Sequence, residues 1–161
     1  MKTSKKQTVK KINAVKSVLK EHPVLTYEEA HFVDSLKPVW NYSLFTGKDI
    51  INFKNGTFYN GYQKFGSHSL NVLNTPGFYF AVWAPNATKV SVIGAFNGWK
   101  EQLHPLYVRL DKSGIWEGFI PHIKPGETYK YQIKGFKGTV TQKTDPYAQF
   151  CELRPATASI T

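Results

Sequence analysis

The chain has 161 residues, 41% of them hydrophobic and 24 aromatic, so it is long enough for one domain with an apolar core. The single cysteine, Cys151, excludes an internal disulfide and fits a reducing cytoplasm. No apolar run reaches the length of a membrane span, and the basic N-terminus lacks the apolar stretch of a signal peptide, so we expect a cytoplasmic protein that does not contact a membrane.

The formal net charge of +10 is concentrated at the N-terminus. Residues 1–22 hold seven lysines and one glutamate, a net charge of +6, whereas the remaining 139 residues carry only +4. This distribution favours a solvated basic helix or arm. Binding to nucleic acid is the less favoured alternative.

An amphipathic helix is expected near the N-terminus. Apolar residues recur at helical spacing from Val9 to Leu19, with lysines between them, and predict a helix over residues 7–20 that ends before Pro23. Its apolar stripe is narrow and has no large aromatic residue. We therefore favour docking on the protein itself over binding to a membrane surface.

A second short helix is expected directly afterwards. Thr26 and Glu29 have the spacing of a capping box, and the helix they start would extend to about Leu36 because Pro38 prevents its continuation. Residues 1–37 are thus interpreted as a basic N-terminal helical segment.

Residues 38–75 have a looser pattern, rich in Asn, Gly and Ser, with scattered aromatic residues. We interpret them as an irregular lead-in with short strands, held on the following domain by its aromatic side chains. His68 lies in this segment, but no nucleophile or orienting carboxylate is identifiable near it, so a structural role is favoured over a catalytic one.

Residues 76–161 contain short strand patterns separated by turn signals such as Ala84-Pro85-Asn86. The expected strands, in chain order, cover residues 78–83, 90–93, 106–110, 115–120, 129–133 and 139–142. Short strands without intervening helices are typical of a β-sandwich. The expected fold class is therefore mainly β: an immunoglobulin-like antiparallel β-sandwich preceded by a short α-helical N-terminal segment.

Within this sandwich, Trp83 and Trp116 lie inside strand patterns and are expected in the core. Trp99 differs, because it lies at the end of a loop bounded by glycines. That position is compatible with a ring presented for binding and equally with a ring that covers the end of the sandwich.

No catalytic set is identifiable in the sequence. Glycoside chemistry requires two carboxylates on either side of the scissile bond, and the acidic residues of the strand region single out no pair. The five histidines and one cysteine show no metal-ligand spacing, and no glycine-rich phosphate loop follows a strand. We therefore expect no catalytic residue, no metal and no cofactor in this chain.

Several motifs resemble a known family. VWAPNA at residues 82–87, followed by VSVIGAFNGW at residues 90–99, is similar to the start of the family 48 carbohydrate-binding module. The motifs GIWEGFIP (114–121), YKYQI (129–133), TDPYA (144–148) and ELRPATAS (152–159) follow in the family order. From about Leu44 onward, the chain resembles the N-terminal part of bacterial 1,4-α-glucan (glycogen) branching enzymes. One departure is Ala95, where the family usually has an acidic residue.

The resemblance implies a module that binds or positions α-glucan and contains no catalytic residues. In branching enzymes the nucleophile and the acid/base lie on a (β/α)₈ barrel that follows the module, and residues 76–161 would end about where that barrel begins. The implied partners are α-1,4-glucan, as glycogen or malto-oligosaccharides, and the catalytic barrel of the same parent chain. Neither nucleic acid nor a membrane is expected as a partner.

The resemblance also implies site residues. In related glycogen-binding domains, the aromatic of the FN-x-W loop and the lysine of the Y-K-[FY] strand contact sugar, and these match Trp99 and Lys130. A second stacking tryptophan normally follows that lysine; here the nearest candidate is Phe136. Asn97 either donates to a sugar hydroxyl or stabilises its own turn.

Three hypotheses stay open at this point. The first is the N-terminal module of a glycogen branching enzyme, favoured by the order DPYA then RPATAS. The second is the carbohydrate-binding module of another enzyme of the α-amylase superfamily, such as a debranching enzyme. The third is a basic, aromatic-rich β domain for single-stranded nucleic acid, which is disfavoured because the basic charge and the aromatic residues lie apart in the sequence.

Overall fold

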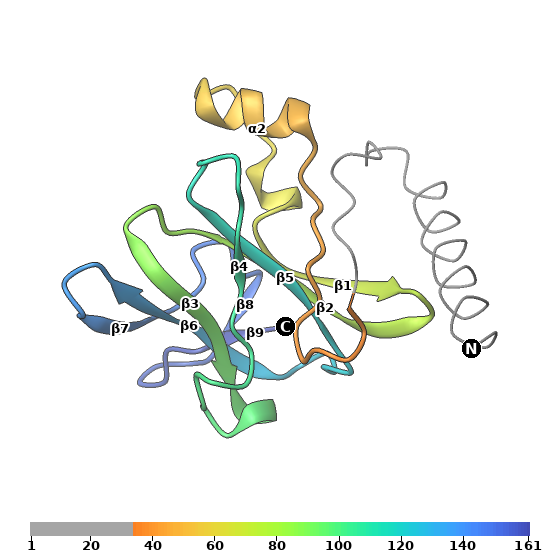
Figure 1. Ribbon diagram of the computed structural model, residues 1–161. Helices are drawn as coiled ribbons and strands as arrows, with labels where there is room; N and C mark the ends of the chain where they lie inside the picture. The colour runs from red at the N-terminus through yellow and green to blue at the C-terminus, as the bar shows by residue number, and fades with distance from the viewer. Residues whose placement is uncertain (1–33) are drawn as a thin grey trace, which may run out of the picture.

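The computed structural model describes residues 34–161 (Figure 1). The helix expected over residues 7–20, and most of the one expected up to Leu36, lie outside the described residues. At the start of the described part the backbone forms a turn, in which the amide of Lys37 donates to the carbonyl of Asp34 at 3.1 Å.

Two antiparallel sheets form the body of the fold (Figure 1). The first sheet has the strand order β1-β2-β5-β4, with bounds β1 Gly66–Val72, β2 Thr75–Trp83, β5 Ile115–Pro121 and β4 Tyr107–Val108. The second has the order β3-β6-β9-β8, with bounds β3 Ala87–Gly94, β6 Thr128–Gly135, β9 Ser159–Ile160 and β8 Phe150–Cys151. A further strand, β7 (Val140–Lys143), pairs with β6. The expected immunoglobulin-like β-sandwich is confirmed.

The main core lies between the two sheets. Alternate residues of each strand face it: Phe78, Phe80 and Val82 from β2, Trp116 and Ile120 from β5, Val90 and Val92 from β3, and Tyr129 and Tyr131 from β6. The two-residue period of these strands was readable in the sequence. In β6 it places Tyr129 and Tyr131 inward and leaves Lys130 between them on the outer face.

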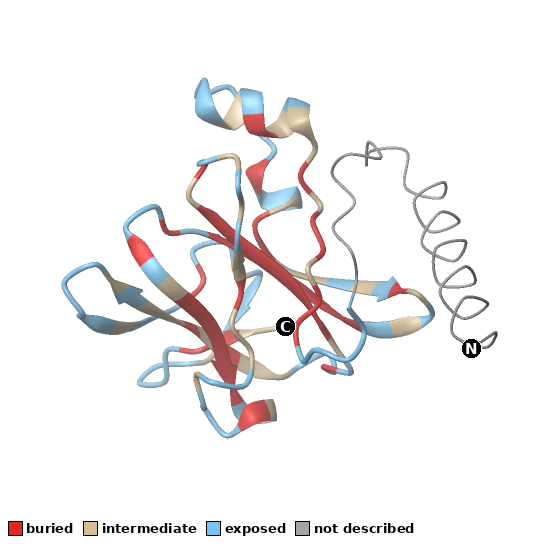
Figure 2. Cartoon of the chain, in the orientation of Figure 1, coloured by how far each residue is buried: buried red, intermediate tan, exposed pale blue. Residues whose placement is uncertain are grey.

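A second core covers the opposite face of the first sheet. Tyr79, Ala81, Ile115 and Phe119 of β2 and β5 contact residues of the lead-in, namely Trp40, Tyr42, Phe45, Ile50 and Phe65. Consequently β2 and β5 are buried on both faces and appear red along most of their length in Figure 2. The first sheet is therefore the middle layer of three.

The lead-in also extends the first sheet. Trp40 forms an antiparallel bridge with Phe119, in which the amide of Trp40 donates at 2.7 Å and that of Phe119 donates back at 3.0 Å. The hydroxyl of Tyr107 donates to the carbonyl of Val39 at 3.1 Å. Together with its aromatic side chains, these bonds fix the lead-in on the sandwich.

The lead-in contains a regular helix that the sequence analysis did not predict. Helix α2 (Gly47–Lys54) starts with a capping box, in which the amide of Asp49 donates to the hydroxyl of Thr46 and the amide of Thr46 donates to the carboxylate of Asp49. A short 3-10 helix, η1 (Gly61–Gln63), precedes β1. Since β1 pairs with β2, the sheet begins at Gly66, inside the segment interpreted as a lead-in.

The expected burial of Trp83 is wrong, whereas that of Trp116 is confirmed. Trp116 is 8% exposed, and its indole N–H donates to the carbonyl of Ala84 at 3.1 Å. Trp83 is 56% exposed, because it lies at the end of β2, where the only aromatic ring paired with it in the described residues is that of Phe53. A position inside a strand pattern therefore did not predict how much of the Trp83 ring is exposed.

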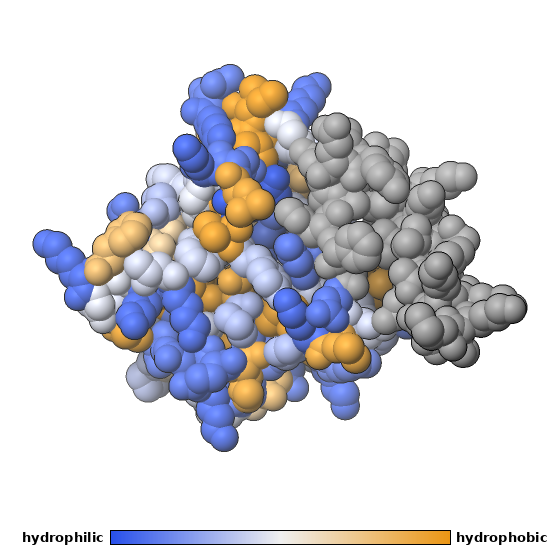
Figure 3. Space-filling view, in the orientation of Figure 1, coloured by the Kyte–Doolittle hydropathy of each residue, from blue (hydrophilic) through white to orange (hydrophobic). Residues whose placement is uncertain are grey.

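Apolar side chains are also exposed on the face of the molecule drawn in Figure 3. Apolar surface, in orange, lies there over α2 and over the β4–β5 hairpin. Ile51 of α2, Val108 of β4 and Leu110 after it are all exposed. Apolar side chains are therefore exposed at the β4 edge of the first sheet. The outer face of β6 in the second sheet instead carries the polar residues Lys130, Gln132 and Lys134.

Candidate functional site

Trp99 lies on a tight loop that follows β3. After Gly94 the chain forms the 3-10 helix η2 (Ala95–Asn97), and then Gly98 and Trp99 both adopt φ 61°. A left-handed backbone costs a non-glycine residue about 1–2 kcal/mol. The amide of Trp99 donates to the carbonyl of Gly94 at 2.9 Å, which closes the loop. The Trp99 side chain is 41% exposed, so the loop presents part of its ring to solvent.

Asn97 holds this loop from the inside. Its side chain is only 6% exposed. The side-chain oxygen accepts from the amide of Gly94 at 3.0 Å, and the side-chain nitrogen donates to the carbonyl of Val92 at 2.9 Å and lies 2.8 Å from Nδ1 of His104. The structure therefore places Asn97 behind the loop, with its polar atoms used within the protein.

Lys130 lies at the same end of the second sheet as the Trp99 loop. In the β3–β6 register, Lys130 is opposite Ile93 and Tyr129 is opposite Gly94, the last residue before η2. The ammonium group of Lys130 donates to Oγ1 of Thr157 at 2.8 Å, and this contact is exposed. An ammonium group has three donors, so it keeps further donors for a ligand.

The chain after Trp99 is fixed to the same sheet. The side chain of Gln132 donates to the carboxylate of Glu101, which attaches the segment after Trp99 to β6. The amide of Leu106 donates to the carbonyl of Val90 at 2.9 Å, and Pro105 forms a bridge with Ser91. The loop is thus held at both of its ends on β3 and β6.

Phe136 lies at the other end of β6. It follows Gly135, the last residue of the strand, and is 74% exposed in the turn that leads to β7. Gly135 lies five positions after Lys130, about 16 Å along a strand. The structure therefore brings Trp99 and Lys130 to one end of the second sheet and does not bring Phe136 to them.

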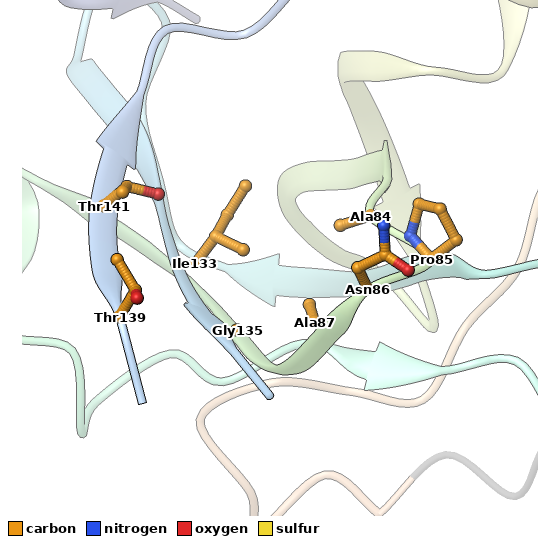
Figure 4. Close-up of a pocket in the computed structure, with 8 residues that line it drawn as sticks. All are labelled: Ala84, Pro85, Asn86, Ala87, Ile133, Gly135, Thr139 and Thr141. Carbon is orange, nitrogen blue, oxygen red and sulfur yellow. The ribbon is translucent and has the colours of Figure 1, made fainter. Parts of the chain in front are cut away.

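A shallow, mostly apolar groove lies beside Phe136. It is lined by Ala84, Pro85, Asn86 and Ala87 of the β2–β3 turn, and by Ile133, Gly135, Thr139 and Thr141. Figure 4 shows Ile133 between the two threonines and the turn. The hydroxyls of Thr139 and Thr141 and the amide of Asn86 are the polar side-chain groups among these lining residues.

The sequence analysis missed a buried ion pair. Glu117 is 2% exposed in the middle of β5, and one of its carboxylate oxygens accepts from Nη1 of Arg109 at 2.7 Å. The other accepts from the hydroxyls of Tyr79 at 2.5 Å and Ser43 at 2.9 Å. Burial raises the pKa of Glu117, although the hydrogen bonds from these donors and the charge of Arg109 act to lower it. The sequence pattern did indicate that Glu117 is buried, because Glu117 lies on the same face of its strand as the apolar residues Ile115 and Phe119.

Asp145 of the TDPYA motif forms a second buried polar cluster. It is 4% exposed, and one carboxylate oxygen accepts from the hydroxyls of Tyr129 at 2.7 Å and Tyr131 at 3.0 Å. The other accepts from the amide of Tyr147 at 2.8 Å. Burial raises the pKa of Asp145, although these donors stabilise its charge. Asp145 and Glu117 are thus enclosed by their own hydrogen-bond partners and offer no surface to a substrate.

His68 has the structural surroundings expected for it. Its Nε2 lies 2.9 Å from the carbonyl of Phe65, and its ring stacks on Tyr79 with centroids 6.4 Å apart. Within residues 34–161 there is no group of three His, Cys, Asp or Glu residues that could hold a metal ion. In the same part of the chain no helix is both long and apolar enough to cross a membrane.

The described residues thus form a β-sandwich with exposed aromatic side chains on its loops. Residues 64–148 match the family model of carbohydrate-binding module 48, described as the isoamylase N-terminal domain, and the chain belongs to this family.

Curated relatives agree with the expected resemblance to branching enzymes. The 1,4-alpha-glucan branching enzyme GlgB of Trichodesmium erythraeum is 46% identical over 112 residues, which is 70% of this chain and 14% of that protein. The GlgB of Thermosynechococcus vestitus is 50% identical over 115 residues, 71% of this chain and 15% of that protein. The chain therefore spans about one seventh of the length of these relatives.

Among solved structures, pullulanase from Bacillus acidopullulyticus is similar with a TM-score of 0.48 and 21% identity, over 61% of this chain and 11% of that chain. PulA from Klebsiella pneumoniae gives a TM-score of 0.48 and 24% identity, over 61% of this chain and 9% of that chain.

Proposed function

We propose that this chain is the α-glucan-binding module of a cytoplasmic glycogen branching enzyme, whose parent transfers α-1,4-glucan segments to form α-1,6 branches. Family membership and relatives that are 46% and 50% identical branching enzymes support this proposal. The observation that carries the binding role is the 41% exposed Trp99, whose amide is hydrogen-bonded to Gly94, at the same end of the second sheet as Lys130. A debranching parent is less well supported, since the relatives described above are branching enzymes.

The proposed contact is a glucose ring on the indole of Trp99. A glucose ring has an apolar C–H face, and covering about 50–80 Å² of apolar surface stabilises a complex by roughly 1–2 kcal/mol. This energy corresponds to about a tenfold effect on affinity. Lys130 donates to sugar hydroxyls, and Asn97 contributes by holding the loop. Because the contact with sugar does not neutralise phosphates, its affinity depends only slightly on salt.

Phe136 is proposed as a separate, weaker contact. Its side chain is 74% exposed, and it follows Gly135, which lines the groove together with Thr139, Thr141 and Asn86. Since about 16 Å of strand separates this turn from Lys130, the two contacts share one glucan chain only when that chain is extended over the sheet. Two weak contacts on one polymer raise the overall affinity through effective concentration.

The remaining partner is the catalytic barrel of the same parent chain. A weak module is useful when the barrel holds the same polymer, because the second binding event is then intramolecular. The half-exposed Trp83 and the exposed Leu110 offer apolar surface for such a neighbour. The proposal places catalysis outside this chain, so the purified chain is expected to leave the iodine stain of amylose unchanged and to produce no new reducing ends.

The test of the binding role is a titration with maltoheptaose, followed by tryptophan fluorescence and NMR. Trp99→Ala is expected to lower the affinity about tenfold, and Phe136→Ala to lower it less. Trp83→Ala is the matched control, because it removes another half-exposed tryptophan from the far end of β2 and is expected to bind like the wild type. Equal affinity of wild type and Trp99→Ala would place the site elsewhere. Nucleic-acid binding predicts instead a steep loss of affinity for an oligonucleotide with salt.

A further inference from the structure

The protonation of His104 can be assigned from the hydrogen bonds of Asn97. The amide of Gly94 can only donate, so the atom of Asn97 that it contacts at 3.0 Å is the oxygen. The carbonyl of Val92 can only accept, so the atom 2.9 Å from it is the nitrogen. That nitrogen donates its second hydrogen to Nδ1 of His104 at 2.8 Å. Nδ1 must therefore be an acceptor, and His104 is neutral with its proton on Nε2.

We propose that His104 is a positioning residue for Trp99, and that its protonation on acidification loosens the Trp99 loop and weakens the binding of α-glucan. The part of this inference that concerns glucan binding rests on the proposed function. The part that concerns the loop can be tested on the free protein.

The connection from His104 to Trp99 runs through Asn97. Asn97 joins the end of β3, at Val92 and Gly94, to His104, where the chain returns along the edge of β3. Gly94 in turn accepts from the amide of Trp99 at 2.9 Å. A proton on Nδ1 would place two donors 2.8 Å apart and remove the bond. One N–H of the buried Asn97 amide would then lack an acceptor, which is costly away from water.

The surroundings of His104 favour the neutral ring. Its side chain is half-buried and contacts the ring of Phe96, with centroids 5.4 Å apart. Burial lowers the pKa of His104. Two charged groups on the neighbouring elements have other partners, since Glu101 accepts from Gln132 and Lys130 donates to Thr157. Within residues 34–161, His104 takes part in no ion pair that would keep its proton.

The sign of the pH effect follows from this shift. We call the Trp99 loop closed when Asn97 is bonded to His104 and open when this bond is broken. A free histidine has a pKa of about 6.5, and the open loop exposes His104 and gives it this ordinary value. Because the closed loop has the lower pKa, the open loop binds the proton first as the pH falls. The closed loop is therefore fully favoured above about pH 6.5 and loses stability relative to the open loop as the pH falls below that value.

The experiment uses the 161-residue chain and two variants of His104. His104→Asn places a side-chain oxygen near the position of Nδ1, which accepts a hydrogen bond but cannot be protonated in this range. His104→Ala lacks the acceptor. His122→Asn is the control, because His122 is exposed in a turn with φ 65°, a conformation that asparagine tolerates.

The first readout is the NMR spectrum of the free protein between pH 7.5 and 5.5. In the wild type and in His122→Asn, the Trp99 indole and the Asn97 side-chain amide are expected to shift with a midpoint below about 6.5. In His104→Asn these signals are expected to stay unchanged with pH. In His104→Ala they are expected at the acidic wild-type positions already at pH 7.5, with a cooperative melt that shows the sandwich to be folded.

The second readout is the affinity for maltoheptaose at both pH values. A severalfold loss on acidification in the wild type, with no pH dependence in His104→Asn, supports the inference. The same pH profile in His104→Asn as in the wild type would overturn it, as would pH-independent loop signals in the wild type. Absence of binding at pH 7.5 would instead refute the proposed function, and the loop signals would still decide the role of His104.

Discussion

Trp83 and Trp116 lie on neighbouring strands, one residue apart in the β2–β5 register, but they differ in exposure. Trp116 fills the core between the sheets, so Trp116→Ala is expected to cost about 3–5 kcal/mol of unfolding free energy. Trp83→Ala removes a contact with Phe53 and one hydrogen bond to the carbonyl of Ser113, and is expected to cost about 1 kcal/mol. Urea denaturation measures both. Equal losses would mean that Trp83 is as buried as its neighbour.

Asp145 makes a pH-dependent contribution to stability. Because burial raises its pKa, the folded state binds a proton more readily than the unfolded chain does. The contribution of Asp145 is therefore most favourable at low pH and is lost as the pH rises through its folded pKa. Asp145→Asn removes this titration. The unfolding free energy of the wild type, minus that of the variant, is expected to increase from pH 7 to pH 4.

Urea denaturation at the two pH values checks this difference. Asp111→Asn is the matched control, since Asp111 has a lowered pKa through its bonds to Ser113 and Arg109, against a burial effect that raises it. The corresponding difference for Asp111 is expected to decrease from pH 7 to pH 4. A decrease for Asp145 as well would contradict the assignment.

At the level of elements, the capping box of α2 starts a helix within the lead-in. Thr46 starts the helix, and Lys64 donates to the carbonyl of Leu44 and pairs with Asp49 at 3.3 Å. Thr46→Ala removes the acceptor of one helix-terminal amide and is expected to cost about 1 kcal/mol. Thr46→Ser keeps the hydroxyl and is expected to retain most of the stability. Thermal unfolding of both variants is the measurement, and equal losses would show that the methyl group matters instead.

Strands were the part of the fold most readable from the sequence. The two-residue period gave β2, β5 and β6, since each is a regular alternation ended by a turn, and for β6 it also gave Tyr129 and Tyr131 as inward residues. Helix α2 was missed, because Gly47 and Asn52 in an eight-residue stretch resemble a loop, although Thr46 and Asp49 had the spacing of a capping box. The burial of β2 on both faces was not readable, since it depends on the lead-in that packs on it.

The candidate site was readable only in part, because the motifs name residues but do not place them. Trp99 and Lys130 lie at one end of the second sheet, which their motifs did not indicate. The separation of Phe136 follows from the length of β6, and the enclosure of Asn97 follows from its contact with His104, seven residues away. Hydrogen bonds of this kind depend on the path of a loop, for which no periodicity exists.

At the level of the whole molecule, residues 1–22 are expected to be separable from the sandwich. They carry +6 of the net charge of +10, and the described residues 34–161 already contain both cores and both sheets. The charge break predicts that deleting residues 1–22 leaves the sandwich folded.

The deletion variant is expected to unfold cooperatively, with a melting temperature within a few degrees of the wild type. For a domain of this size, such a shift corresponds to a change of about 1 kcal/mol in unfolding free energy. Circular dichroism gives the melt, and NMR gives the signals of buried residues such as Tyr129 and Tyr131, which report on the core between the sheets. Loss of the cooperative transition would show that the N-terminal segment packs into the core. An unchanged transition with altered maltoheptaose affinity would show that the segment contacts the glucan, because the sandwich itself would be intact.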